Sequence, residues 1–137
     1  MTSQPLEIPP GNAMFDGYRA AFETYGFSPA VTSKGFLFIS GQVGVRPDGT
    51  TPDDVAEQTE CALRRIEELL RLAGLTFADL VDVTSYHVDI ENTLPAFMEA
   101  KRRIITAPYP AWSIIGISGL SRPALKVEIK ATAALRD

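Results

Sequence analysis

The chain has 137 residues, of which 45% are hydrophobic and 22% charged, and its formal net charge is -4. This length is enough for one domain with a buried core and too short for two. An acidic surface repels nucleic-acid backbones, so the composition disfavours a nucleic-acid partner. The sequence has no apolar run of about 18 residues that could span a membrane, and its start lacks the basic and apolar segments of a secretory signal. We therefore expect a cytoplasmic protein without a membrane partner.

The first part of the chain predicts little regular structure. Residues 1–12 contain three prolines and one glycine, a composition typical of an irregular arm. Apolar residues then recur at helical spacing from Ala13 to Tyr25 and predict a helix that covers one edge of a sheet. We divide the chain into an N-terminal arm, residues 1–26, and a single domain, residues 27–137.

The next segment predicts a hairpin followed by a long helix. Residues 30–33 and 36–43 read as strands joined by a tight turn, and Ser40 and Gly41 lie near the end of the second strand. A glycine at this place allows a ligand to approach the backbone closely. The helix is expected to begin with Thr51 as its N-cap and Pro52 in its first turn, and its apolar face to lie across the sheet. That face comprises Val55, Thr59, Ala62, Ile66, Leu69, Leu70 and Ala73.

Residues 80–90 are rich in β-branched side chains and predict a strand between two helices, hence a crossover in a mixed sheet. This strand carries His87, the only histidine of the chain. A lone histidine is more often a packed side chain than a catalyst, although its near-neutral pKa keeps a proton-transfer role open. The second helix is expected to be capped by Asn92 or Thr93, with Pro95 in its first turn. Its apolar side comprises Leu94, Phe97, Met98, Ile104 and Ile105, whereas Lys101, Arg102 and Arg103 predict a solvated face.

Two strands complete the chain. Residues 112–118 and 125–135 both alternate with a period of two, and we expect them to be adjacent in the sheet, so that Trp112 and Glu128 come within reach of each other. Apolar residues on both faces of the later strands indicate that both faces are covered, which requires a partner. The order β-β-α-β-α-β-β predicts an α+β domain with one mixed sheet and two helices on one of its faces.

Four motifs make a resemblance specific: Gly-Gln-Val-Gly (41–44), Asp-Val-Thr-Ser-Tyr-His (82–87), Pro-Ala-Trp-Ser (110–113) and Val-Glu-Ile-Lys-Ala (127–131). In this order and spacing they resemble the RidA/YjgF family of enamine/imine deaminases, and most of all its YjgH-like branch, over roughly residues 27–134. The resemblance implies a YjgF/chorismate mutase-like fold. It also implies a homotrimer whose three cavities lie between protomers and take a small molecule.

The resemblance also implies the site chemistry, with four departures. Deaminases of this family hold the substrate carboxylate with an arginine after Pro-Ala, while a glutamate assists water in hydrolysing the C=N bond. In this chain the arginine position is Trp112, which offers one neutral donor and an apolar face, and the glutamate is Glu128. Three further positions are more apolar than the family pattern. They are Ile114 in place of a cysteine, Met98 in place of an asparagine and Phe27 in place of a tyrosine.

The leading hypothesis is a trimer that binds a small, relatively apolar molecule and hydrolyses an imine or enamine lacking the usual α-carboxylate. Glu128 would be the base or position the water, although a charge on a polar strand face is the simpler interpretation of this residue. The binding residues would be Trp112, Ile114, Phe27, Ser40, Gly41 and Met98. A non-enzymatic binding protein is the alternative, and deamination of 2-aminoacrylate-type imines has the least support unless another cation, such as Arg122, reaches the cavity. No metal or cofactor is expected, because the sequence has no histidine–cysteine cluster, P-loop or dinucleotide fingerprint.

Overall fold

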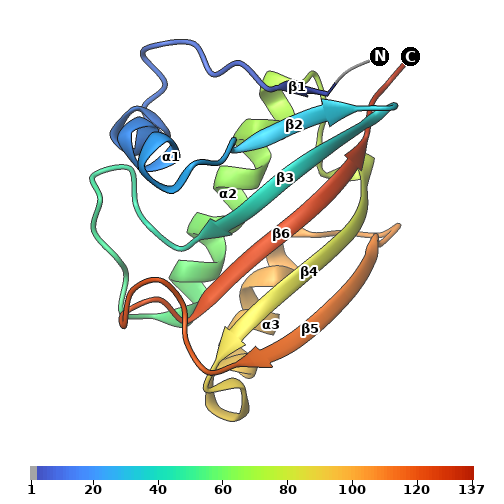
Figure 1. The fold of residues 1–137 in the computed structure, drawn as a ribbon. Helices are drawn as coiled ribbons and strands as arrows, with labels where there is room; N and C mark the ends of the chain where they lie inside the picture. Colours follow the sequence, from blue (N-terminus) through green and yellow to red (C-terminus); the bar gives the residue numbers. More distant parts are fainter. Residues whose placement is uncertain (1–2) are drawn as a thin grey trace.

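A six-stranded mixed sheet in the order β1-β2-β3-β6-β4-β5 forms the centre of the computed structural model, which describes residues 3–137 (Figure 1). Neighbouring strands run antiparallel except β4 and β5, which are parallel and are connected by a helical crossover. The expected α+β class, the mixed sheet and the order of the main elements are thereby confirmed. The strands are β1 (Gln4–Pro5), β2 (Ala30–Ser33), β3 (Phe36–Val43), β4 (Leu80–Val88), β5 (Ala111–Ile117) and β6 (Val127–Ala134).

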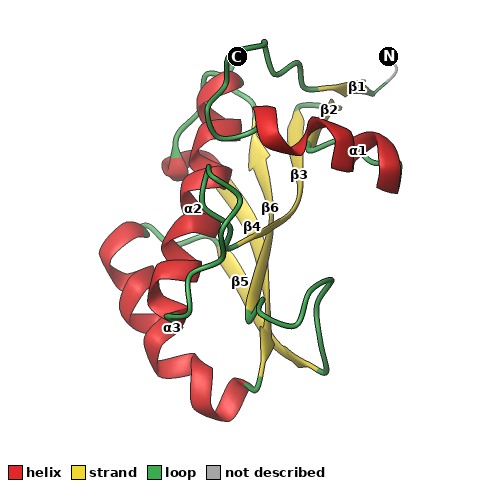
Figure 2. Cartoon of the chain, turned by 90° about the vertical axis from the view of Figure 1, so that its left-hand side faces the viewer, coloured by secondary structure: helices red, strands yellow, loops and turns green. Residues whose placement is uncertain are grey.

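The two long helices, α2 (Val55–Leu72) and α3 (Ile90–Ile104), lie on the same face of the sheet (Figure 2). They bury the apolar face predicted for α2 together with the inward residues of β6, and these form one core with Phe97 of α3. The smaller helices are η1 (Asp16–Tyr18), α1 (Arg19–Tyr25) and η2 (Phe77–Asp79). No helix in the described part of the chain is both long and apolar enough to cross a membrane.

Both long helices begin at places other than those expected. Asp54, not Thr51, caps α2, because its carboxylate accepts a hydrogen bond from the Ala56 backbone nitrogen at 3.3 Å and also suits the positive end of the helix. Helix α3 begins at Ile90 without a side-chain cap, and its Pro95 is therefore inside the helix. Its expected cap at Asn92 or Thr93 is wrong: the Thr93 hydroxyl donates to the carbonyl oxygens of Val88 and Asp89.

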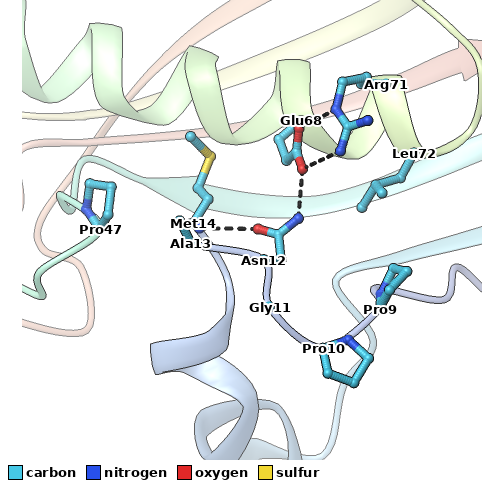
Figure 3. Close-up of a pocket in the computed structure, with 10 residues that line it drawn as sticks. All are labelled: Pro9, Pro10, Gly11, Asn12, Ala13, Met14, Pro47, Glu68, Arg71 and Leu72. Carbon is cyan, nitrogen blue, oxygen red and sulfur yellow. Dashed lines mark hydrogen bonds and ion pairs between the residues drawn. The ribbon is translucent and has the colours of Figure 1, made fainter.

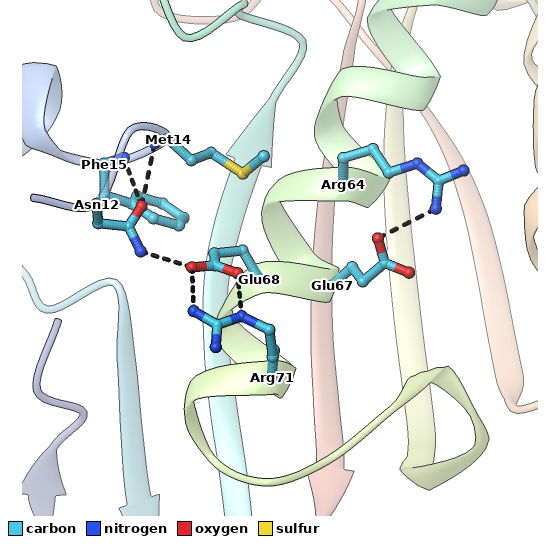
Figure 4. Close-up of polar contacts among 7 residues, drawn as sticks. All are labelled: Asn12, Met14, Phe15, Arg64, Glu67, Glu68 and Arg71. Carbon is cyan, nitrogen blue, oxygen red and sulfur yellow. Dashed lines mark hydrogen bonds and ion pairs between the residues drawn. The ribbon is translucent and has the colours of Figure 1, made fainter.

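The N-terminal arm is packed against the domain. Strand β1 pairs with β2, with Gln4 opposite Thr32, where the sequence predicted irregular structure. The side-chain amide of Asn12 donates to Glu68 on α2 at 2.6 Å, and Glu68 also accepts from Arg71 (Figure 4). The regular part of the predicted helix from Ala13 starts later, at Asp16, because the Asn12 side chain caps the preceding turn by accepting from two backbone N–H groups.

Strand β6 is inserted between β3 and β4, so the expected adjacency of the last two strands is wrong. Residues 118–126 carry the chain past the end of β4, where the Val88 nitrogen donates to the Lys126 carbonyl oxygen. Trp112 pairs with the buried Val83 on the helix-covered face, whereas Glu128 pairs with Tyr86 on the opposite face. Within one chain, therefore, Trp112 and Glu128 do not share a site.

The face of the sheet opposite the two long helices exposes large apolar side chains. Phe38 on β3 is 45% exposed and Ile115 on β5 is 42% exposed, and Phe36 is similar. Neither α2 nor α3 lies over this face (Figure 2). An apolar sheet face in water is unfavourable, and such a surface is typical of an interface with another chain.

Candidate functional site

The site residues inferred from the sequence lie in two separate groups. The first, the Glu128 group, consists of Phe27, Ser40, Gly41 and Glu128. The second, the Trp112 group, consists of Met98, Trp112 and Ile114. The β-strand alternation places Glu128 and Trp112 on opposite faces of the sheet, with β4 between their strands. The structure therefore presents two half-sites, which a single chain does not bring together.

A bulge in β3 places Gly41 directly against Glu128. Between Ile39 and Gln42 the register with β6 shifts by one residue, so β3 carries an extra residue at this point. A side chain at position 41 would collide with the Glu128 carboxyl, because an added Cβ would lie 2.6 Å from Cδ. Gly41 is thus the residue that allows the carboxyl to lie over the backbone of the bulge.

The Glu128 carboxyl lines a cavity of about 520 Å³ at the edge of the sheet. Its walls come from α1, β3, α2 and the β5–β6 loop. Phe27 lies on this wall and packs edge to face on Phe22, with ring centroids 5.3 Å apart. Ser40 contributes indirectly, because its hydroxyl donates to the Ser28 carbonyl oxygen at 2.6 Å and ties the Phe27 segment to the strand.

Burial raises the pKa of Glu128 above its ordinary value. A carboxylate with a raised pKa is a stronger base once it is ionised and can exchange a proton closer to neutral pH. Arg122, on the β5–β6 loop, is exposed and lines the same cavity. The cation considered in the sequence analysis therefore does border the Glu128 cavity.

In the Trp112 group, the indole is held by a buried pair of polar side chains. Its Nε1–H donates to the Ser85 hydroxyl at 2.9 Å, and Ser85 Oγ lies 2.8 Å from His87 Nε2. The indole also packs against Phe97, with ring centroids 6.2 Å apart. Trp112 is half-buried, so its ring has a fixed orientation while one part of it remains accessible.

A cation lies on the indole. Lys101 Nζ is 4.4 Å from the centre of the Trp112 ring and 5.6 Å from that of Tyr109. Burial, together with the nearby charge of Arg102, lowers the pKa of Lys101. A solvated face was predicted for this lysine and the contact was not expected, although its spacing of four residues from Phe97 puts both residues on one side of α3. Next to this cluster, Ile114 is 40% exposed and Met98 is half-buried against the core.

His87 is a packed residue in this structure. It is fully buried, its ring lies edge to face on Phe97 at 4.4 Å, and burial lowers its pKa, so the neutral form is favoured. Its Nδ1 has no hydrogen-bond partner in the described residues. The role of His87 is to hold Ser85, which in turn holds the indole.

Three hollows beside α2 carry none of the catalytic or binding residues inferred from the sequence. One of about 430 Å³ lies between the N-terminal arm and α2 and is lined by Pro9, Pro10, Asn12 and Glu68 among others (Figure 3). Its acid is already engaged by Asn12 and Arg71. Within residues 3–137 no three histidine, cysteine or acidic side chains come together as a metal site.

Comparison with known proteins relates the chain to one family. The sequence profile of a family described as Endoribonuclease L-PSP matches residues 19–135. The chain is 38% identical over 122 residues to the RutC family protein YjgH of Escherichia coli K12, covering 88% of this chain and 92% of that protein. It is 33% identical over 103 residues to the 2-iminobutanoate/2-iminopropanoate deaminase of the same organism, covering 73% and 80% respectively.

The fold agrees with that relationship. A solved structure of protein YjgH superimposes with a TM-score of 0.82 at 34% identity, covering 98% of each chain. A structure of Rv2704 from Mycobacterium tuberculosis, described as a member of the YjgF/YER057c/UK114 family, superimposes with a TM-score of 0.78 at 29% identity and covers 98% of this chain and all of that one. The chain belongs to the YjgF/RidA family.

Proposed function

We propose that three copies of the chain join through their exposed sheet faces, so that the Trp112 group of one protomer faces the Glu128 group of the next. Two observations support this arrangement. The two groups lie on opposite faces of one sheet, and the apolar face that carries Phe38 and Ile115 lacks a cover within the described chain. Each completed cavity would then hold an acid on one wall and an indole on the other.

In this cavity the protein binds a small, relatively apolar imine or enamine and hydrolyses its C=N bond. Glu128 accepts a proton from water as the oxygen attacks the carbon, which gives a carbinolamine. Glu128 passes that proton to the nitrogen, and transfer of the carbinolamine hydroxyl proton to the nitrogen then breaks the C–N bond, which releases ammonia and leaves a carbonyl compound. The observation that carries this proposal is the Glu128 carboxyl, held over Gly41 on the cavity wall with a pKa raised by burial.

The substrate class follows from the other wall. An indole cannot replace the two-pronged hydrogen bonding of a guanidinium, but it can pack against an apolar or aromatic group. Together with Ile114, Met98 and Phe27, it favours a substrate without the α-carboxylate of 2-imino acids. The relatives named as 2-iminobutanoate/2-iminopropanoate deaminases supply the reaction type, and the residues of this chain argue for a different substrate.

A non-enzymatic metabolite-binding protein is the second candidate, favoured by one observation. Trp112 stands where the family's deaminases carry the arginine that orients the substrate, and orientation supplies much of the rate in such a reaction. An endoribonuclease, as the family description says, is disfavoured by the net charge of -4.

The proposal is tested by following carbonyl formation from a panel of aryl and alkyl imines with the wild type and Glu128→Gln. Loss of the base is expected to lower the rate by about 10²-fold or more, while Glu99→Gln, at an exposed acid on α3, serves as the matched control. Equal turnover by wild type and Glu128→Gln would discard the assigned role of Glu128. Binding of these compounds without turnover above buffer would favour the second candidate.

A further inference from the structure

Arg65 on α2 is a buried cation of the kind that is rarely left without a counter-charge. Arg65 is only 4% exposed, and its Nε–H donates to the Gln42 side-chain oxygen at 3.0 Å. The guanidinium lies between two aromatic rings, with its central carbon 4.8 Å from the centre of the Phe15 ring and 4.3 Å from that of Tyr18. Stacking on two rings favours a cation, but it leaves most of the in-plane N–H groups without acceptors.

The described residues provide no acid for this guanidinium. Arg65 makes no ion pair in residues 3–137, and its Nη1 is buried without any hydrogen-bond partner. The preceding residue behaves differently, because Arg64 points to the outer side of α2 and pairs with Glu67 at 3.1 Å (Figure 4). A buried, unpaired charge is costly, and burial lowers the pKa of Arg65 accordingly. An acceptor that is not part of this chain would remove that cost.

Arg65 lines two cavities, and the larger of them also contains Glu128. Arg65 and Gln42 lie at its helix-covered side and Glu128 at its open side, so the cavity passes around the edge of β3, beyond Ala30, the first residue of β2. Aromatic side chains line the space between: Tyr18, Phe22, Tyr25 and Phe27. Arg122 adds a second cation at the rim, so the lining carries two cations and one acid.

The lining of this cavity is complementary to a ligand with one negative charge on an apolar body. Two cations against one acid leave a single positive charge for a ligand to neutralise. Gln42, which accepts a hydrogen bond from Arg65, and Glu128 come from opposite faces of the sheet and line the same cavity, so a ligand in it can lie between the guanidinium and the acid. The volume of about 520 Å³ accommodates a ring-sized body.

We propose that this cavity binds a small monocarboxylate with an aromatic or comparably apolar body, its carboxylate held by Arg65 and Arg122 and its body against the Tyr18–Phe27 wall. Guanidinium groups bind carboxylates through paired, charge-assisted hydrogen bonds. The anion-holding function is thereby placed beside Glu128 rather than at position 112. This carboxylate is not the α-carboxylate that the proposed function leaves out, because the apolar body of the ligand, and not its carboxylate, would reach Glu128. Only this link to the reaction rests on the proposed function; the binding itself does not.

The test measures binding of phenylacetate, benzoate and butanoate by calorimetry, with phenylacetamide as the neutral counterpart of phenylacetate. At least one carboxylate is expected to bind, with phenylacetamide at least tenfold weaker than phenylacetate. Arg122→Gln and Arg65→Gln are each expected to weaken carboxylate binding tenfold or more, and Arg64→Gln, the matched control on the outer side of α2, to leave it unchanged. Because Arg65→Gln removes a buried side chain, circular dichroism checks its fold, and Arg65→Lys and the exposed Arg122→Gln provide independent readings.

The inference is overturned if no carboxylate binds, if phenylacetamide binds as well as phenylacetate, or if both folded variants at 65 and 122 bind like the wild type. Its failure can be told apart from failure of the proposed function. Hydrolysis of neutral imines that depends on Glu128, without carboxylate binding, would leave the function standing and remove the anion site. Carboxylate binding that depends on Arg65, with no imine hydrolysed, would leave the anion site standing and remove the proposed function.

Discussion

Substituting Gly41 by alanine tests whether the bulge in β3 positions the Glu128 carboxyl. An added Cβ would lie 2.6 Å from Glu128 Cδ, and ordinary contact requires about 3.4 Å, so the carboxyl must move by about 0.8 Å. The obstacle is the end of a flexible side chain, which can rotate away. We therefore expect the free energy of unfolding to change by no more than about 1 kcal/mol.

Gly41→Ala should change the rate of imine hydrolysis much more than the free energy of unfolding. A displacement of about 1 Å at a reacting group can cost on the order of 10²-fold in rate, and we expect a loss of that size in imine hydrolysis. A carboxyl that has moved toward water also loses the burial that raises its pKa, so the pKa of Glu128 is expected to fall toward its ordinary value. The pKa can be followed by carbon-13 NMR of the carboxyl carbon, which requires no substrate.

Gly44→Ala is the matched control. There the added Cβ would lie 2.5 Å from the Gln58 carbonyl oxygen, a backbone atom that cannot rotate away. We expect this variant to lose about 1–3 kcal/mol of stability by overpacking, while any folded fraction keeps the raised pKa of Glu128. An unchanged Glu128 pKa and an unchanged rate in Gly41→Ala would refute the role given to the bulge.

Three further predictions follow from particular contacts. Trp112→Phe removes the hydrogen bond to Ser85 and should lower the free energy of unfolding, measured by urea denaturation, by about 1 kcal/mol. If that bond is the cause, the losses of stability in Trp112→Phe and Ser85→Ala will not add up in the double variant. Burial lowers the pKa of His87, so as the pH falls below about 6.5 the unfolded chain binds a proton at this histidine before the folded chain does. The free energy of unfolding of the wild type should therefore decrease below that pH. An equal dependence of the free energy of unfolding on pH in wild type and His87→Gln would contradict this. Ile115→Asp should convert an assembly of about 45 kDa into a 14.9 kDa monomer in light scattering, while Arg103→Asp should not; a monomeric wild type would end the shared-cavity proposal.

Periodicity predicted most of the fold because each main element has a strong local pattern. The alternating β-branched residues of β4 and the three- and four-residue spacing in α2 depend only on which face is buried, and both elements formed over most of the expected residues, although α2 begins later than predicted. The insertion of β6 between β3 and β4 was not predicted, since strand order is decided by loop length and by pairing across the sheet. The periodicity of a strand does not indicate which other strands will pair with it.

In the candidate site, too, some residues were predicted from the sequence and others were not. The motifs pointed to Gly41 and Glu128, and the structure places these two in contact. The contact of Lys101 with Trp112 and the stacking of Arg65 on Tyr18 were not predicted, because each joins a helix residue to a residue outside that helix, which helical spacing does not indicate. An arginine in a helix of ordinary polarity looks solvated until its burial is known.

The central claim, that Trp112 of one protomer meets Glu128 of its neighbour, is tested most directly by mixing two inactive variants. Trp112→Ala and Glu128→Gln are co-expressed, mixed trimers are identified by native mass spectrometry, and hydrolysis of an imine that the wild type accepts is measured. With random assembly of equal amounts, about a quarter of the junctions have both native halves, so we expect recovery of about a quarter of wild-type activity. Mixed trimers that remain as inactive as their parents would contradict it.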